Sequence, residues 1–204
     1  PSRLSATRLP GKPLLKINGV SIISHVFKKA KEADLGEVYV ATEDKEILDD
    51  VHLNNGKAIL TSNKHKTGSD RIFECFEKLD LKNIDYIINL QGDEPNIDIN
   101  DLKHLNKLVH INKPEIGTLG SEIKDKSSLN NENIVKVITE SKITDVNFPI
   151  AKDFKRKLKN LELNTYHHLG IYAYKPNVLK KIIKLKQTNG EIENRLEQLR
   201  AVEN

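Results

Sequence analysis

The chain has 204 residues, a net charge of +4 and a hydrophobic fraction of 37%, which describes a polar globular domain large enough for a core. No apolar run approaches the roughly 18 residues that a membrane span needs, and no signal-peptide pattern is present. A single cysteine, Cys75, excludes an internal disulfide framework, so a cytoplasmic setting is expected. Aromatic residues are only 5%, and no basic helix carries stacking residues, which makes nucleic acid the least favoured partner.

The first thirteen residues, PSRLSATRLPGKP, predict a loop because two prolines and a glycine interrupt any helical hydrogen-bonded run. Three cations, Arg3, Arg8 and Lys12, stand in this loop beside several backbone N–H groups, a combination that suits a polyphosphate. Arginine contributes only six of the 33 basic residues, so two arginines in one short loop favour a function over filler. The simpler alternative is a frayed basic terminus.

Strands and helices alternate over the next hundred residues. Helical periodicity covers 21–35, 44–55, 71–79 and 98–111, and β-rich runs cover 37–42, 57–62 and 85–90. Ser69 or Asp70 is the expected N-cap of the third helix. The alternation predicts an α/β fold with a mostly parallel sheet and helices on both faces.

The pattern changes after Pro114. Short strand-like runs at 116–123, 134–140 and 143–150 predict an antiparallel excursion, and another strand is expected at 167–175. Two helices should follow, from Asn177 and from Glu191, and the basic run 152–159 should be a solvated loop or helix face. There is no repeat, linker or second core, so 1–204 is expected to be a single domain.

Both ends suggest a piece of a longer chain. A phosphate-binding loop normally follows a strand, so we expect the first strand to precede Pro1. The last helix stops without a cap, and we expect a further segment after Asn204.

Two carboxylates, Asp93 and Glu94, follow the apolar strand in LQGDEP. The carboxyl edge of such a strand is where open α/β sheets bind ligands, and Mg²⁺ often needs only one or two carboxylates beside substrate phosphates. A simple turn is the alternative, because Gly-Asp and Glu-Pro pairs are common at strand ends.

Three further segments are individually ambiguous. HKTGSDR (65–71) fits a capped helix start, LEQLR (196–200) fits an amphipathic helix, and HHLGIY (167–172) fits a strand. His167 and His168 point to opposite faces of that strand, so they do not chelate one metal together. No P-loop, GxGxxG, HExxH or paired CxxC motif is present.

Taken with LLKINGVSIISHV after the first loop, these five segments and their spacing resemble the 3-deoxy-manno-octulosonate cytidylyltransferases (CMP-Kdo synthetases) along the whole chain. The resemblance implies a Rossmann-like nucleotide-diphospho-sugar transferase fold, a homodimer, and transfer of CMP from CTP to the acidic sugar Kdo for lipopolysaccharide biosynthesis. Arg8, Lys12 and Asp93 are the implied catalytic residues, and Asp93 would bind Mg²⁺. The implied nucleotide-binding residues are Arg3, Thr7, Arg8, Lys12, Thr67, Gly68, Ser69, Asp70 and Arg71. The implied sugar-binding residues are Gln91, Glu94, Asn147, His168, Glu197 and Gln198.

One segment departs from the family. Where the family has Ser-Arg-x-Pro-Ile-Pro, this chain reads VNFPIA, with Asn147 in place of the arginine and Ala151 in place of the second proline. A lost arginine should weaken recognition of a sugar carboxylate. The open alternatives are a cytidylyltransferase for another acidic sugar (an 8-amino-Kdo or a sialic-type acid) and a CTP-binding pseudoenzyme.

Overall fold

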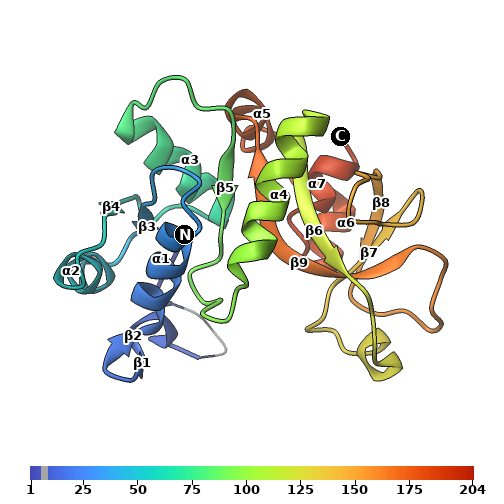
Figure 1. Cartoon of the computed structure of the whole chain (residues 1–204), viewed down its shortest axis with the longest axis horizontal. Coiled ribbons are helices and arrows are strands. Elements are labelled where there is room, and N and C mark those ends of the chain that lie inside the picture. Colours follow the sequence, from blue (N-terminus) through green and yellow to red (C-terminus); the bar gives the residue numbers. More distant parts are fainter. Residues whose placement is uncertain (6–8) are drawn as a thin grey trace.

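The computed structural model describes residues 1–5 and 9–204, and it has helices packed on two groups of strands (Figure 1). The α-helices are α1 (Ile22–Glu32), α2 (Lys45–Leu53), α3 (Gly68–Leu79), α4 (Ile99–Asn112), α5 (Pro176–Ile182), α6 (Asn189–Asn194) and α7 (Leu199–Val202). The strands are β1 (Lys16–Ile17), β2 (Val20–Ser21), β3 (Val40–Thr42), β4 (Ala58–Leu60), β5 (Ile87–Asn89), β6 (Ile116–Ser121), β7 (Lys136–Thr139), β8 (Ala151–Lys155) and β9 (Thr165–Tyr174). Two 3₁₀ turns, η1 (Lys12–Leu14) and η2 (Lys126–Leu129), complete the described elements.

The α/β class is confirmed, but the strands pair differently from the expectation of a mostly parallel sheet. Parallel pairing is described for β3 with β4 and for a bridge between Ser2 and Thr42. The larger sheet is antiparallel, because the long strand β9 runs opposite to β5, β6 and β7 and pairs with all three, while β8 pairs with β7. The predicted antiparallel excursion therefore makes up most of this sheet.

Helices cover both faces of the larger sheet, as expected. Side chains alternate along a strand, and in β9 Ile171 and Ala173 pack in one core cluster with α4. Tyr174, on the opposite face, packs in another cluster with α3 and α5. A third cluster joins α1 and α2 to β3 and β4, through buried residues such as Ile23 and Ile47.

Two expectations about the region after β6 are wrong. No strand covers 143–150, where the Asn147 amide bonds to backbone groups of its own loop and Pro149 has no N–H to donate. The basic run 152–159 is not a loop or helix face throughout, because its first residues lie in β8. There the Phe154 side chain is buried, and Phe154 pairs with Val137 of β7.

Two helix boundaries also differ. Thr67, rather than Ser69 or Asp70, is the N-cap of α3. The single helix expected from Glu191 is two helices, because Arg195 adopts a left-handed φ of 53° and ends α6. Leu196 then turns into the core beside Val137. Among the described helices, none has the length and apolarity that crossing a membrane would require.

Candidate functional site

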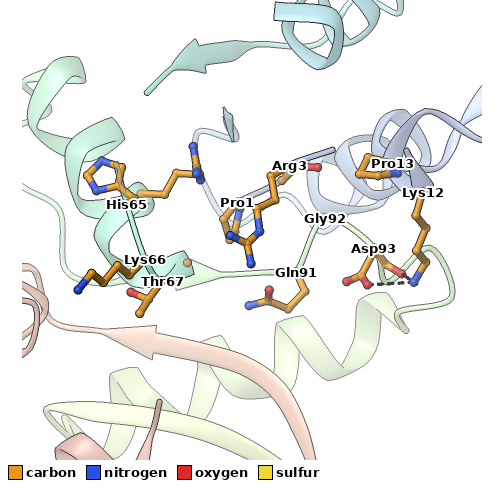
Figure 2. A pocket seen from close by; sticks show the side chains of 13 residues that line it. Pro1, Arg3, Lys12, Pro13, His65, Lys66, Thr67, Gln91, Gly92 and Asp93 are labelled. Carbon is orange, nitrogen blue, oxygen red and sulfur yellow. Dashed lines mark hydrogen bonds and ion pairs between the residues drawn. The ribbon is translucent and has the colours of Figure 1, made fainter. Parts of the chain in front are cut away.

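A cavity of about 230 Å³ lies between the N-terminal segment, the start of α3 and the turn after β5 (Figure 2). Its lining carries several cationic side chains and one carboxylate. The lining residues are Pro1, Ser2, Arg3, Lys12, Pro13, His65, Lys66, Thr67, Gly68, Arg71, Gln91, Gly92 and Asp93. Such a lining suits an anion, and we call this space the cationic cavity.

Lys12 and Asp93 form an ion pair at one end of the cationic cavity. Gly11 has a φ of 72°, which glycine adopts without strain, and the turn brings Lys12 to the start of η1. Lys12 Nζ donates to Asp93 Oδ2 at 2.9 Å and to the Asp93 carbonyl at 3.3 Å. Both side chains remain partly exposed, so the pair is accessible to a ligand.

The turn that carries Asp93 depends on Gly92. The Gly92 N–H donates to the Pro1 carbonyl at 3.2 Å, and a Cβ on Gly92 would lie 2.8 Å from that oxygen. Only glycine therefore fits this approach. Glu94 follows Asp93 and does not line the cationic cavity. The pKa of the Glu94 carboxyl is raised, mainly by burial and also by the neighbouring Asp93 carboxylate.

The start of α3 forms the next wall. The Asp70 N–H donates to Thr67 Oγ1 at 3.3 Å, and the Asp70 carboxylate accepts from the Thr67 N–H and hydroxyl, which makes a capping box. Thr67 and Gly68 line the cationic cavity. Asp70 does not line it, and its side chain holds the helix start, which differs from its expected role in nucleotide contact.

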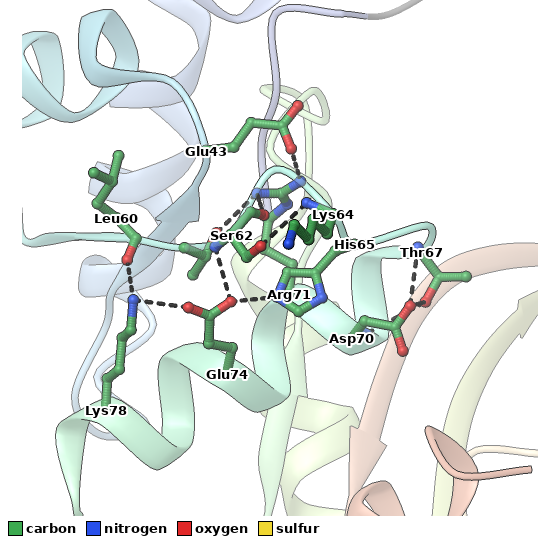
Figure 3. Close-up of polar contacts among 11 residues, drawn as sticks. Glu43, Leu60, Ser62, Lys64, His65, Thr67, Asp70, Arg71, Glu74 and Lys78 are labelled. Carbon is green, nitrogen blue, oxygen red and sulfur yellow. Dashed lines mark hydrogen bonds and ion pairs between the residues drawn. The ribbon is translucent and has the colours of Figure 1, made fainter.

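Arg71 lines the same cavity, but its guanidinium is already engaged (Figure 3). It is 3% exposed, forms an ion pair with Glu43, and donates to Thr61 Oγ1 at 2.8 Å. This buried pair links α3 to the end of β3. Arg71 therefore holds the wall of the cavity in place, and its expected contact with the nucleotide stays a prediction.

The loop before α3 is fixed by a second carboxylate, Glu74 (Figure 3). Glu74 accepts from the Ser62 N–H at 2.8 Å and also pairs with His65 and Lys78. Burial opposes its ionised form, yet the hydrogen bonds from Lys78, Ser62 and His65 prevail and lower the pKa of Glu74 to about 2. The loop that lines the cationic cavity is therefore tied to α3.

A larger cavity of about 1010 Å³ adjoins the first, and Gly68 and Gln91 line both. We call it the main cavity. Gln91 donates to Asn89 Oδ1 at 3.1 Å, and Asn89 is itself buried at the end of β5. Among the residues that the structure describes, no Lys or Arg lines the main cavity. The two cavities thus differ sharply in charge and meet at Gln91.

His168 of β9 lines the main cavity and is 6% exposed. Its ring meets Phe154 and Tyr172 at centroid distances of 5.0 and 5.4 Å. Nε2 lies 3.0 Å from Thr118 Oγ1. Burial, and then the neighbouring His167, lowers the pKa of His168 to about 4, so the imidazole is neutral at physiological pH.

Glu197 and Gln198 reach the main cavity from the link between α6 and α7. Arg156 of the basic run caps the break before this link, donating to the carbonyls of Asn194 at 2.7 Å and Arg195 at 2.8 Å. Oε1 of Glu197 is buried and has no hydrogen-bond partner within residues 1–5 and 9–204. Burial raises the pKa of Glu197, although nearby hydroxyls act in the opposite sense.

Asn147 lines the main cavity, but its amide serves its own loop. Oδ1 accepts from the Thr144 N–H at 2.7 Å, and Nδ2 donates to the Lys142 carbonyl at 2.6 Å. The amide therefore has a partner at each end. This weakens the expectation that Asn147 offers a spare acceptor to a sugar.

The structure thus brings most of the expected site residues to the two joined cavities. Arg3, Lys12 and Asp93 line the cationic cavity, and Ser69, like His168, lines the main cavity. Thr7 and Arg8 fall outside the described residues. Sequence reasoning missed two residues. Nothing in the sequence around Thr118 marks it as a site residue. Asn89 could have been identified, because it is a polar residue at the end of an apolar strand.

Comparison with known proteins gives a consistent result. A family model described as Cytidylyltransferase matches residues 1–204. The 3-deoxy-manno-octulosonate cytidylyltransferase of Nitrobacter winogradskyi is 40% identical over 100% of this chain and 80% of its own length, and that of Thermodesulfovibrio yellowstonii is 40% identical over 100% and 84%. A solved CMP:2-keto-3-deoxy-manno-octonic acid synthetase complexed with CTP superposes with a TM-score of 0.87 at 34% identity, covering 99% of this chain and 83% of that one. A glucose-1-phosphate thymidylyltransferase structure from Bacillus anthracis, described as putative, shares the fold at 17% identity, with a TM-score of 0.60 over 93% of this chain and 72% of that one.

Proposed function

The chain belongs to the cytidylyltransferase family, and we propose that it transfers CMP from CTP to the anomeric hydroxyl of Kdo, releasing pyrophosphate. The observation that carries this proposal is the pair of joined cavities. One is lined by cations and one carboxylate, and the other lacks Lys and Arg among its described lining residues. A nucleoside triphosphate suits the first and a polyhydroxylated sugar suits the second, so the reacting atoms would meet near Gln91.

In this proposal CTP binds in the cationic cavity. Arg3, Lys12 and Lys66 offer charge to the three phosphates, and the first turn of α3 offers backbone N–H groups. In the same turn the Thr67 hydroxyl closes the capping box, and Thr67 and Gly68 present this end of α3 to the base. Arg71 supports this wall through Glu43, since its guanidinium is not free.

The site fits Mg²⁺ bound through Asp93. This carboxylate is accessible and is already paired with a cation, the ammonium of Lys12. The described residues contain no cluster of three or more His, Cys, Asp or Glu side chains that could hold a metal alone. Mg²⁺ commonly relies on one or two carboxylates plus substrate phosphates, so the single carboxylate is adequate. When bound, the ion would neutralise charge on the phosphates.

The sugar acid would bind in the main cavity, whose lining includes His168, Glu197 and Gln198. The anomeric oxygen forms a bond to the α-phosphorus, the bond from that phosphorus to the bridging oxygen of pyrophosphate breaks, and the hydroxyl proton is released. No protein nucleophile is needed, so the chain contributes position and charge. Gln91 stands where the two substrates would meet.

One observation favours a second substrate. Within residues 1–5 and 9–204, no Lys or Arg lines the main cavity, and the Asn147 amide is engaged in its own loop. A carboxylate placed there would rely on neutral donors such as Gln91 and Gln198, which bind it more weakly than a guanidinium. A related acidic sugar is therefore a second candidate.

The decisive experiment measures pyrophosphate release from CTP, UTP or ATP with Mg²⁺ and Kdo, an 8-amino analogue or a sialic acid. We expect turnover with CTP and Kdo and much less with UTP or ATP. Comparison with Asn147→Arg tests the sugar: a lower KM for Kdo in the variant supports weak carboxylate recognition in the native chain. CTP binding without turnover of any sugar acid would indicate a pseudoenzyme instead.

Three further aspects belong to the same proposal. A homodimer is supported by exposed apolar side chains, Val146, Ile150 and Leu163, in the two loops that flank the end of β7. A cytoplasmic location is supported by the lone buried thiol of Cys75. CMP-Kdo made there would supply lipopolysaccharide biosynthesis.

A further inference from the structure

β9 is irregular where it passes the main cavity. Thr118 of β6 pairs with Tyr172, whereas the next residue, Leu119, pairs with Leu169. Gly170 and Ile171 are therefore extra residues with no partner in β6, and they form a bulge directly after Leu169, the residue that follows His168. Bulges often stand beside active sites, where they change the direction of a side chain.

The hydroxyl of Thr118 fills the gap that the bulge leaves. Thr118 Oγ1 lies 2.7 Å from the Ile171 carbonyl and 3.3 Å from the Leu169 carbonyl. Two oxygens at 2.7 Å require a proton between them, and a carbonyl has none to give. The single hydroxyl proton of Thr118 is therefore committed to Ile171.

The third contact of the same oxygen follows from this commitment. His168 Nε2 lies 3.0 Å from Thr118 Oγ1, which can now only accept. Nε2 must therefore carry a proton and donate it. Because His168 is neutral, its other ring nitrogen, Nδ1, then has a lone pair.

Nδ1 is available to a ligand. It has no hydrogen-bond partner among the described residues, and it is not one of the buried polar atoms that lack a partner. It is therefore open to solvent, and His168 lines the main cavity. An ordinary buried histidine, satisfied on both sides by protein groups, would not leave an accessible acceptor.

We propose that Thr118 is a positioning residue that fixes His168 in the Nε2–H form, so that Nδ1 accepts a hydrogen bond from a sugar hydroxyl. This rests on the proposed function for the identity of the sugar. The lone pair would repel the carboxylate of a sugar acid. The carboxylate would therefore turn away from His168, toward donors such as Gln91 and Gln198.

The test uses the 204-residue chain labelled with ¹⁵N-histidine. Long-range ¹H–¹⁵N spectra identify which ring nitrogen carries the proton, and loss of one signal set in His168→Gln assigns His168 among the seven histidines. Thr118→Val removes the hydroxyl, and Thr118→Ser keeps it. Thr165→Val is the matched control, because Thr165 is a buried threonine of β9 whose hydroxyl has no partner in the described part of the chain.

We expect His168 to be Nε2-protonated in wild type, Thr118→Ser and Thr165→Val, and to lose that preference in Thr118→Val. The KM for Kdo should rise roughly tenfold or more in Thr118→Val, with CTP affinity unchanged. Nδ1 protonation in the wild type would overturn the inference without any variant. A wild-type tautomer and KM in a folded Thr118→Val would do the same. If the wild type is Nε2-protonated but turns over no sugar acid, the tautomer assignment stands, and both the proposed function and the sugar contact are overturned.

Discussion

Arg200 and Glu191 form a buried ion pair, and its loss should strongly lower the free energy of unfolding. Their side chains are 5% and 4% exposed, and the guanidinium contacts both carboxylate oxygens, at 2.8 Å from Nε to Oε2. The two residues stand on either side of the link that carries Glu197 and Gln198 into the main cavity. Arg200→Met keeps most of the buried volume but leaves the Glu191 carboxylate with hydrogen bonds from Gln187 Nε2 and the Thr188 backbone N–H alone, within the described part of the chain.

The expected loss is set by the unpaired carboxylate. Removing one partner of a buried pair costs about 3–5 kcal/mol. A domain of this size has about 5–15 kcal/mol of stability, so the variant should remain folded but melt roughly 6–20 °C lower. The effect depends on pH. The hydrogen bond from Arg200 lowers the pKa of Glu191, so its stabilisation is present above the ordinary value of 4.5 and is lost as pH falls toward the folded value.

Urea unfolding at pH 7 measures the loss, with Arg195→Met as the matched control, because Arg195 is an exposed arginine of the same segment. Glu191→Leu combined with Arg200→Met should recover part of the stability, since it removes the buried charge altogether. The KM for the sugar should rise in Arg200→Met more than the KM for CTP. A loss below about 1 kcal/mol relative to Arg195→Met would refute the reasoning, because that is the range of an exposed pair.

Four other outcomes are expected. Lys12→Ala should raise the Kd for CTP roughly 10- to 100-fold, while Lys16→Ala, an exposed control, leaves it unchanged in the same titration; equal affinities would remove Lys12 from the phosphate site. Asp93→Asn should melt like wild type but lose Mg²⁺-dependent pyrophosphate release, and a wild-type rate would exclude Asp93 as the metal ligand. Gly92→Ala should lose about 1–3 kcal/mol of stability, because the new Cβ would lie 2.8 Å from the Pro1 carbonyl; an unchanged melting curve would contradict that close approach. As pH decreases from 6.5 to about 4, the unfolding free energy of wild type should fall by about 3 kcal/mol more than that of His168→Gln, because unfolding lets His168 take up a proton; equal slopes in the two proteins would assign the fall to other groups.

Local patterns predicted local structure well. The apolar spacing in 21–35 and 98–111 depends on neighbours within one helix, and α1 and α4 formed there. The apolar run before Asp93 likewise formed a strand, β5, and the turn that follows it lines the cationic cavity. The cap of α3 was misplaced because Thr67, Ser69 and Asp70 all carry suitable oxygens, and only the folded geometry shows that two of them form one capping box.

Side-chain roles that depend on distant partners could not be predicted. Arg71 was expected at the nucleotide, but Glu43, 28 positions earlier, engages its guanidinium. Thr118 contacts a histidine 50 positions later, beside a β-bulge that no local sequence pattern predicts. The parallel character of the sheet was overestimated for the same reason, since strand direction is set by the long strand β9.

The central place of β9 has a consequence for how the protein folds. Ile87 pairs with Tyr174, eighty-seven positions later, so closing this ladder requires ordering a very long loop of chain. The contacts among α1, β3, α2 and β4 are short-range and can form early, whereas the β5–β9 pairing should be slow. Gln91 and His168 are brought together only by that late step. During synthesis the cationic cavity can therefore take shape before the ribosome has supplied the strand that completes the main cavity.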